Sequence, residues 1–329
     1  MKKGLMGVMM LLFASMTLLA GCASDASGDE KVTIGVTQIV EHPSLDAAFE
    51  GFKEALAENG YVEGENVTYD VQIAQGDMNN AQSIANNFVG DKVDLIFANA
   101  TPSAQSALNA TKDIPIIFTS VTDPVGANLV ASFDEPGDNI TATSDTHPDA
   151  IPQTINLIVD ELQPEKIGVI YNSGEQNSTV QVDVIKEVLG DTNVELVPVS
   201  VSTSAEVKQA AESLVGRVDA MYIPTDNTVV SALESVIDVA QKEDIPMFAG
   251  ELDSVEAGAV AGSGFSYKAL GYETGEMAAQ VLNGDKEPSD IPVSYPQNLK
   301  LVINKDAAEA QGLEIKDEWS DIAEFYEGE

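Results

Sequence analysis

The stretch Asp113-Ile-Pro-Ile-Ile-Phe118 returns in nearly the same form as Asp244-Ile-Pro-Met-Phe-Ala249. Each copy directly follows a helix-like segment and continues as a short apolar run, which is the pattern of a buried strand. A helix-to-strand junction that occurs twice indicates that the chain contains two halves of similar construction.

The first half alternates strand-like and helix-like segments. Short β-branched and apolar runs are separated by stretches in which apolar residues recur at helical spacing. Strands joined by helices require right-handed crossovers, so the pattern predicts a parallel sheet covered on both faces. The predicted strands are 32–38, 67–74, 94–99 and 114–119, and the predicted helices are 44–59, 79–89 and 102–111.

The second half repeats this order. Its predicted strands are 166–171, 194–201, 219–224 and 245–249, and its predicted helices are 180–189, 205–215 and 229–241. We therefore expect an α/β protein with two doubly wound, Rossmann-like lobes. One large open sheet is the alternative.

Three segments are candidates for crossings between the lobes. They are the Thr- and Ser-rich stretch 140–148, the Gly-rich run 257–266 before a predicted helix 268–282, and the region near Pro296 before a predicted strand 299–303. A three-segment hinge suits closure over a cleft. It predicts an N-terminal lobe of 31–145 plus about 257–295, a C-terminal lobe of 146–256 plus about 296–320, and an acidic tail of 321–329.

The N-terminus has the pattern of an export signal. Lys2 and Lys3 precede an apolar run over 5–19, which is short and wrongly flanked for a membrane span. The run ends in Leu19-Ala-Gly-Cys22, which resembles the lipobox of bacterial lipoproteins, where the cysteine is acylated. We expect a signal peptide over 1–21, lipidation of Cys22 and a flexible tether over 22–30. An ordinary signal peptide with an incidental cysteine is the alternative.

Composition excludes several classes of function. The chain carries 54 acidic residues against 16 Lys and Arg, a net charge of −38, so a nucleic-acid backbone would be repelled. His42 and His147 do not have metal-ligand spacing, and Cys22 is the only cysteine. The sequence contains no nucleophile elbow, P-loop or dinucleotide-binding motif at a strand end. We expect no metal, no cofactor and no catalysis.

Five segments, in order along the chain, carry a family resemblance. They are Ala98-Asn-Ala-Thr-Pro-Ser103, Phe118-Thr-Ser-Val-Thr-Asp-Pro-Val-Gly-Ala127, Gly168-Val-Ile-Tyr-Asn-Ser173, Tyr222-Ile-Pro-Thr-Asp-Asn227 and Gly271-Tyr-Glu-Thr-Gly-Glu276. The chain from about Lys31 to Ala310 resembles the ABC-transporter substrate-binding proteins of the tryptophan/tyrosine type, which have the type I periplasmic-binding-protein fold.

This resemblance implies a function. It implies a monomeric binding protein, lipid-anchored at the extracytoplasmic face of the membrane, that captures an amino acid, with an aromatic one favoured, and delivers it to an ABC permease. Two alternatives remain. The protein could present its ligand to a membrane receptor, or it could bind a nucleoside-like or other small solute.

Ligands of doubly wound sheets bind beyond the carboxyl ends of the strands. In the first half, Thr101 and Pro102 begin a predicted helix whose free N–H groups could hold a carboxylate, and helix capping alone is the alternative. The candidate ligand-binding residues of this half are Gln38, Asn99, Ala100, Thr101, Ser120, Thr122 and Asp123.

The second half supplies amide and carboxylate side chains after its strands. Asp226 is the first candidate to bind a ligand ammonium group, followed by Asp123 and Glu251, and a helix cap at Asp226 is the alternative. The candidates of this half are Asn172, Glu175, Gln176, Asn177, Asp226, Asn227 and Glu251. Aromatic candidates at the cleft are Phe118, Tyr171, Tyr222, Phe248, Phe265 and Tyr267.

Overall fold

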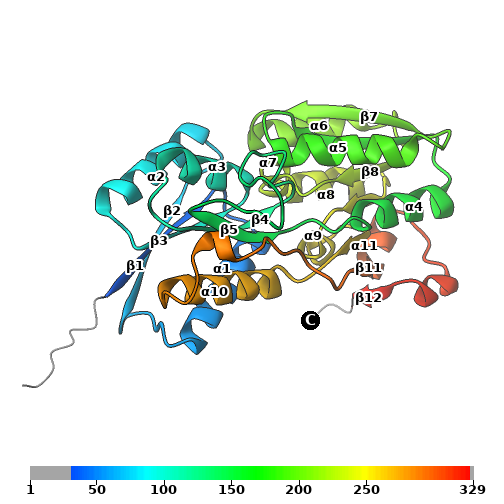
Figure 1. The fold of residues 1–329 in the computed structure, drawn as a ribbon. Coiled ribbons are helices and arrows are strands. Elements are labelled where there is room, and N and C mark those ends of the chain that lie inside the picture. The colour runs from blue at the N-terminus through cyan, green and yellow to red at the C-terminus, as the bar shows by residue number, and fades with distance from the viewer. Residues whose placement is uncertain (1–30, 327–329) are drawn as a thin grey trace, which may run out of the picture. The chain divides into compact units, whose positions relative to one another are not determined.

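Two sheets organise the protein, seen here in a computed structural model that describes residues 31–326 (Figure 1). The predicted signal peptide, the tether and Cys22 lie outside the described residues. Among residues 31–326 we find no helix that combines the length and the apolar character needed to span a bilayer.

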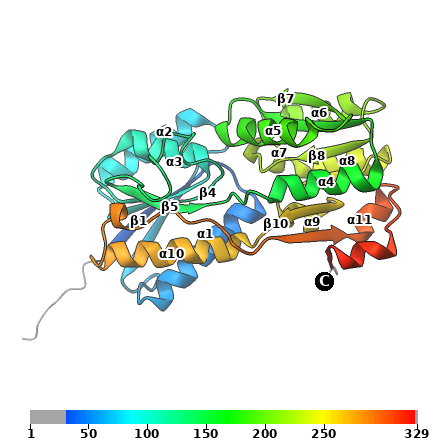
Figure 2. The same cartoon turned by 45° about the vertical axis from the view of Figure 1, so that its right-hand side comes forward.

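The first sheet has five parallel strands. Their order is β2 (Val67–Ile73), β1 (Val32–Gln38), β3 (Leu95–Asn99), β4 (Ile116–Val121) and β5 (Ile140–Ser144). One face is covered by α1 (Pro43–Glu58) and α10 (Tyr267–Leu282), and the other by α2 (Met78–Asp91) and α3 (Thr101–Ala110) (Figures 1 and 2). Helices on both faces of a parallel sheet are the predicted doubly wound arrangement.

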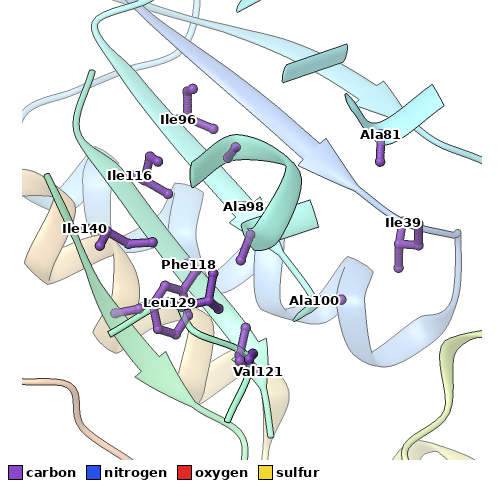
Figure 3. Packing of buried hydrophobic residues seen from close by; sticks show 14 of the residues in the cluster. Ile39, Ala81, Ile96, Ala98, Ala100, Ile116, Phe118, Val121, Leu129 and Ile140 are labelled. Atoms are coloured by element: carbon purple, nitrogen blue, oxygen red, sulfur yellow. The ribbon is translucent and has the colours of Figure 1, made fainter. Parts of the chain in front are cut away.

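The apolar strand residues of this lobe build its core. Ile96 of β3, Ile116 and Phe118 of β4 and Ile140 of β5 are buried side by side beneath α3 (Figure 3). Fully burying side chains of this size is worth roughly 1.5–3 kcal/mol each. This packing fixes the carboxyl end of β4, where the candidate residue Ser120 follows two positions after Phe118.

Helix α10 belongs to the first lobe although it follows strands of the second. It packs against α1 through glycines: a Cβ on Gly271 would lie 1.8 Å from the Ala48 carbonyl oxygen, and one on Gly51 would lie 2.0 Å from the Lys268 carbonyl oxygen. The two helix backbones are therefore close enough to exclude any side chain at either position. This contact holds the start of α10, Tyr267, at the edge of the first lobe.

The second sheet has seven strands, parallel except between β10 and β11. Their order is β12 (Glu324–Tyr326), β11 (Lys300–Asn304), β10 (Ala261–Gly264), β9 (Met247–Ala249), β8 (Ala220–Ile223), β6 (Lys166–Asn172) and β7 (Glu195–Val201). The helices are α4 (Ala150–Leu162), α5 (Gln176–Leu189), α6 (Val207–Leu214), α7 (Asn227–Val230), α8 (Leu233–Lys242), α9 (Leu252–Ala257) and α11 (Lys305–Ala310). Two doubly wound lobes, rather than one open sheet, are confirmed.

The crossings differ in detail from the predicted boundaries. Residues Ile140–Ser144 form β5, so the first crossing begins only after Ser144. Most of the Gly-rich run expected to cross is strand β10, which lies between β9 and β11 in the second sheet. The second crossing is therefore confined to Phe265 and Ser266, directly before α10.

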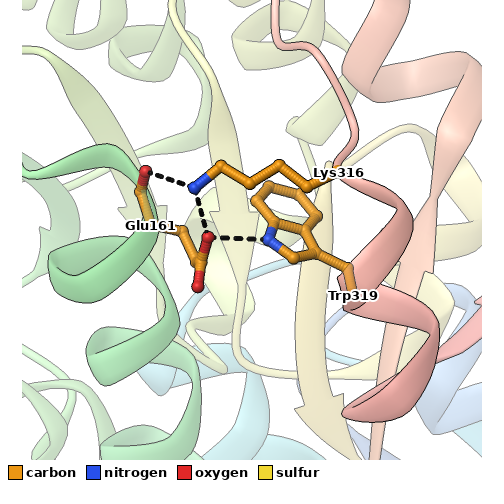
Figure 4. A network of polar contacts seen from close by, with 3 residues as sticks. All are labelled: Glu161, Lys316 and Trp319. Carbon is orange, nitrogen blue, oxygen red and sulfur yellow. Dashed lines mark hydrogen bonds and ion pairs between the residues drawn. The ribbon is translucent and has the colours of Figure 1, made fainter.

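The C-terminal segment, expected to be a solvated acidic tail after residue 320, is part of the second lobe. Strand β12 pairs with β11, and Trp319 is 1% exposed. The Trp319 indole donates to Glu161 Oε2 of α4 at 2.8 Å, and Lys316 Nζ lies 2.5 Å from the same oxygen (Figure 4). The acidic composition of this segment therefore gave no sign that a large aromatic side chain, Trp319, anchors it in the second lobe.

Two helical regions also differ from expectation. The helix predicted over 229–241 is two helices, α7 and α8, which are separated at Ser231 and Ala232. Helix α4 has no counterpart among the predicted elements. It connects the first crossing to β6 and carries Thr154, whose hydroxyl accepts a hydrogen bond from the backbone N–H of Ser263 at 2.9 Å.

Candidate functional site

A small cavity lies between the lobes, where the carboxyl ends of the strands meet. Its space is about 20 Å³, little more than one water molecule requires. It is lined by His42, Leu45, Ser120, Thr122, Asp145, Asn177, Thr225, Asp226, Asn227, Val230, Glu251 and Tyr267. The lobes are therefore closed on one another around a polar centre.

The first-lobe wall is built at the end of β4. The pairing of β4 with β5 shifts register between Phe118 and Val121, and Ser120 has a left-handed φ of 58°. Bulges and left-handed non-glycine residues are strained, and they re-aim side chains at functional sites. Thr122 and Asp145 follow β4 and β5, and Tyr267 begins α10. The Tyr267 hydroxyl donates to Asp145 Oδ2 at 2.8 Å.

The second-lobe wall is a hydrogen-bonded network centred on Glu175. This carboxylate accepts from Asn227 Nδ2 at 2.5 Å, from Thr228 Oγ1 at 2.8 Å and from Asn177 Nδ2 at 3.3 Å. The loops before α5 and α7 are thereby joined. Because each amide in the network is oriented by its partners, this wall is rigid before any ligand arrives.

Asp226 forms the start of α7. Its Oδ1 accepts from the Val229 N–H at 2.8 Å, as a helix N-cap, and its Oδ2 accepts from the Asn172 N–H at 2.6 Å. The side chain is fully buried. Helix capping, the alternative considered from the sequence, therefore occupies one carboxylate oxygen, and the backbone at the end of β6 occupies the other.

Direct hydrogen bonds connect the lobes. Ser44 Oγ at the start of α1 lies 2.6 Å from Asp253 Oδ2 and 3.1 Å from Glu251 Oε2, both of the second lobe. Gln176 Nε2 donates to Asp123 Oδ2 at 3.0 Å. Ser44 makes its contact deep in the interface, whereas the Gln176 contact lies outside the cavity.

Burial changes the protonation of the groups around the cavity. Burial, reinforced by the charge of Glu175, raises the pKa of Asp226 to about 7, and burial with the neighbouring Asp253 raises that of Glu251 to about 7. Burial also raises the pKa of Asp145 and lowers that of His42 to about 4, against a side-chain hydrogen bond to Asn227 that favours the protonated ring. His42 is therefore neutral at pH 7.

Several polar atoms at the cavity have no hydrogen-bond partner among the described residues. They are His42 Nδ1, Ser120 Oγ, Asp145 Oδ1 and Asn177 Oδ1. Buried polar groups without partners are costly, and they are retained where a ligand completes them. Four such atoms around one cavity mark it as the candidate binding site.

A larger hollow of about 440 Å³ adjoins the cavity. The two share His42, Val230 and Glu251, which form the partition between them. The hollow is bordered by α8 and by the starts of α1 and α9, so it lies between the lobes.

The structure brings some of the predicted site residues to the cavity and places others behind it. Those that line it are Ser120, Thr122, Asn177, Asp226, Asn227 and Glu251. Behind the second-lobe wall, Asn172 and Glu175 support the network. Asp123 and Gln176 bond to each other outside it.

The remaining first-lobe candidates lie away from the cavity. Asn99 Nδ2 donates to Gln38 Oε1 at 3.1 Å and to the Leu45 carbonyl at 2.8 Å, which fixes the start of α1. Ala100, with a φ of 80°, precedes α3, and the buried hydroxyl of Thr101 has no partner among the described residues. None of the four candidates Gln38, Asn99, Ala100 and Thr101 lines the cavity.

The sequence did not single out His42, Leu45, Asp145, Thr225 or Val230 as ligand-binding residues, although all five line the cavity. Tyr267 is the one aromatic candidate that reaches it. Two of these residues stand at positions where the sequence pointed weakly to a site. His42 lies in the loop after β1, and Asp145 lies in the predicted hinge.

Comparison with known proteins identifies the family. A model of the ABC transporter substrate-binding protein family matches residues 33–325. The chain belongs to this family. It is 48% identical, over 91% of its own length and 89% of the relative's, to a tyrosine-binding protein of Clostridioides difficile. The resemblance stated from the sequence is thereby confirmed, and the chain is an ABC substrate-binding protein.

Two solved structures of relatives, one with a bound ligand and one without, differ in how closely they match the structure of this chain. A Streptococcus pneumonia ABC domain in complex with L-Trp is 34% identical, with a TM-score of 0.84 over 90% of this chain and 99% of that one. The ligand-free, open structure of a substrate-binding protein from Clostridium difficile is 44% identical, yet its TM-score is only 0.65 over 91% of this chain and 100% of that one. The structure of this ABC substrate-binding protein is thus closer to the ligand-bound relative, which agrees with its closed cleft.

Proposed function

We propose that this protein captures an aromatic amino acid between its lobes and delivers it to an ABC permease, without chemistry of its own. The single observation that carries the proposal is the interlobe cavity, where four unpartnered polar atoms gather around buried carboxyl groups. The adjoining hollow of about 440 Å³ supplies the volume that an amino acid needs and that the cavity itself lacks. The tyrosine-binding relative and the tryptophan complex support the choice of ligand class. Closure over the ligand would present both lobes to the permease.

We further propose that the protein acts as a monomer held at the extracytoplasmic face of the membrane through acylated Cys22. The support is the sequence Leu19-Ala-Gly-Cys22 after an apolar run, since the residues themselves lie outside the described range. Metabolic labelling with a fatty acid, lost on Cys22→Ala, tests the anchor. Labelling that persists in the variant would contradict it.

The ligand is tested with the soluble protein lacking residues 1–22. Thermal shifts are measured against the amino acids, nucleosides and simple sugars, and each hit is confirmed by calorimetry. We expect selective stabilisation by tyrosine, tryptophan or phenylalanine, since ligands that bind only the folded state raise its melting temperature. A response confined to nucleosides or sugars would keep the fold and overturn the amino-acid assignment.

A further inference from the structure

Three carboxyl groups line the cavity, and only one of them has an oxygen free. Both oxygens of Asp226 accept backbone N–H groups, and both oxygens of Glu251 are bonded within α9, to the backbone N–H and the hydroxyl of Ser254. Asp145 differs. Its Oδ2 accepts from the Tyr267 hydroxyl at 2.8 Å, and the Thr122 side chain also stabilises the carboxylate, while the buried Oδ1 has no hydrogen bond of normal geometry among the described residues.

The described residues that line the cavity offer this oxygen no cationic side chain. None of the twelve residues that line the cavity is Lys or Arg, and the one imidazole there, that of His42, is neutral at pH 7 for the reason given above. A carboxylate held in such a place is stabilised by an opposite charge within a few ångströms. Burial raises the pKa of Asp145 and so favours its neutral form, whereas a ligand ammonium group would supply the opposite charge that favours the ionised form.

The position of Asp145 is fixed before a ligand binds. Its backbone N–H donates to the Val121 carbonyl at 3.2 Å, which ties it to the end of β4. The ring of Tyr267 is 4% exposed and packs against Phe265, with 5.4 Å between ring centroids. The hydroxyl that orients the carboxylate is therefore itself held in place, so the acceptor is preorganised.

We propose that Oδ1 of Asp145 binds the ammonium group of the ligand and that Tyr267 is the positioning residue for it. This inference rests on the proposed function and specifies it: the ligand must carry a primary ammonium group. It replaces Asp226, the sequence-based candidate for this role, because both carboxylate oxygens of Asp226 already accept backbone N–H groups, one at the start of α7 and one at the end of β6.

The location of this pair adds a consequence for closure. Asp145 lies on the first crossing between the lobes, just after β5, and Tyr267 directly follows the second crossing. One hydrogen bond therefore joins two of the hinge segments. A ligand ammonium group on Asp145 contacts the hinge itself, so the same contact that selects the ligand also stabilises the closed arrangement.

The test is calorimetry of the soluble protein with three probes: L-tyrosine, tyramine, which lacks the carboxylate, and 3-(4-hydroxyphenyl)propanoate, which lacks the amine. The isosteric variant Asp145→Asn is expected to weaken tyrosine binding by about 100-fold, as is typical of truncating a buried charge pair. It should weaken tyramine binding too, and leave the already weak binding of the propanoate unchanged or improved. Asp191→Asn, an exposed residue outside the cavity, is the matched control and should change tyrosine binding by less than about threefold.

Tyr267→Phe separates positioning from packing, because it keeps the buried ring and removes only the hydroxyl. We expect a loss of about tenfold for tyrosine with no change for the propanoate, whereas a purely structural defect would weaken both.

The inference is overturned if Asp145→Asn, folded by its circular dichroism, binds tyrosine like the wild type. It is also overturned if the wild type binds the propanoate as tightly as tyrosine. If the wild type binds no amino acid at all, the proposed function falls, and this inference falls with it.

Discussion

The two walls of the cleft differ in how far their buried polar groups are hydrogen-bonded within the protein. On the second-lobe wall, Glu175 and Asp226 have their carboxylate oxygens occupied by neighbouring amides and hydroxyls. On the first-lobe side and the crossings, His42, Ser120 and Asp145 each keep an unpartnered buried atom. The carboxylates of the second-lobe wall are satisfied without a ligand, although Asn177 Oδ1 there is not, whereas the other side keeps an unpartnered carboxylate oxygen at Asp145.

This difference assigns separate roles to the two walls. A saturated network is rigid and costs free energy when it is broken, so substitutions in the second-lobe wall should reduce stability. Unpartnered groups contribute nothing to folding and gain a partner only from a ligand, so substitutions in the first-lobe wall should reduce affinity. Site-directed variants can break or sharpen this contrast.

The largest expected effect is on stability, at Asp226. Asp226→Ala leaves the buried N–H groups of Val229 and Asn172 without acceptors, which should lower the free energy of unfolding by about 2–4 kcal/mol. Asp226→Asn keeps one acceptor oxygen and should cost less. Urea unfolding measures both. An Asp226→Ala variant as stable as the wild type would mean that the hydrogen bonds of Asp226 do not stabilise the second-lobe wall.

The next effect is a pH dependence of the closed, ligand-free form. Glu251 and Asp226 have folded-state pKa values of about 7, above their ordinary 4.5 and 3.8, so their stabilising contribution is complete below about pH 4 and is lost as the pH rises through 7. His42, lowered from 6.5 to about 4, opposes this by losing stability as the pH falls through that window. The two carboxyl groups together change the free energy of unfolding with pH more than the single imidazole does.

We therefore expect the melting temperature of the ligand-free protein to fall from pH 5 to pH 8. Glu251→Gln should reduce that fall, because an amide holds no titratable proton. The strong negative charge of the chain also favours acid, but the variant shares it, so the difference between the two profiles isolates Glu251. Identical profiles would contradict burial of this carboxyl group in the closed state.

The fold was predictable from the sequence because its strands are apolar runs between amphipathic helices. Strand β10 was not, since Ala261–Gly264 lacks β-branched or aromatic residues and is held as a strand by β9 and β11 on either side. Strand β12 was not either, because its acidic surroundings concealed the anchoring role of Trp319. In both cases tertiary partners decide the structure.

The site was predictable where strand topology decides it. Residues after strands, such as Ser120, Asn177 and Asp226, reach the cavity because the carboxyl ends of parallel strands meet there. Asp145 and Tyr267 meet only because α10 returns to the first lobe and packs on α1. Residues that become neighbours through separate chain crossings carry no common signal in one sequence.

A smaller effect is expected at Ser120. Its hydroxyl is buried with no partner among the described residues, so Ser120→Ala should leave the melting temperature unchanged or raise it slightly. The same change should weaken tyrosine binding by about five- to tenfold, if the hydroxyl serves the ligand. A loss of stability comparable to that of Asp226→Ala would erase the distinction between the two walls.

The smallest effects distinguish the two contacts that connect the lobes. Ser44 bonds to the buried Glu251 and the half-buried Asp253, so Ser44→Ala should weaken closure and reduce ligand affinity by about two- to fivefold. Gln176 contacts Asp123 outside the cavity, so Gln176→Ala should change affinity by less than about twofold. Calorimetry of both variants checks the order. If Gln176→Ala reduces ligand affinity more than Ser44→Ala does, the closed form is stabilised mainly by contacts outside the cavity. The second-lobe wall then contributes to closure through Gln176 rather than through the residues that line the cavity.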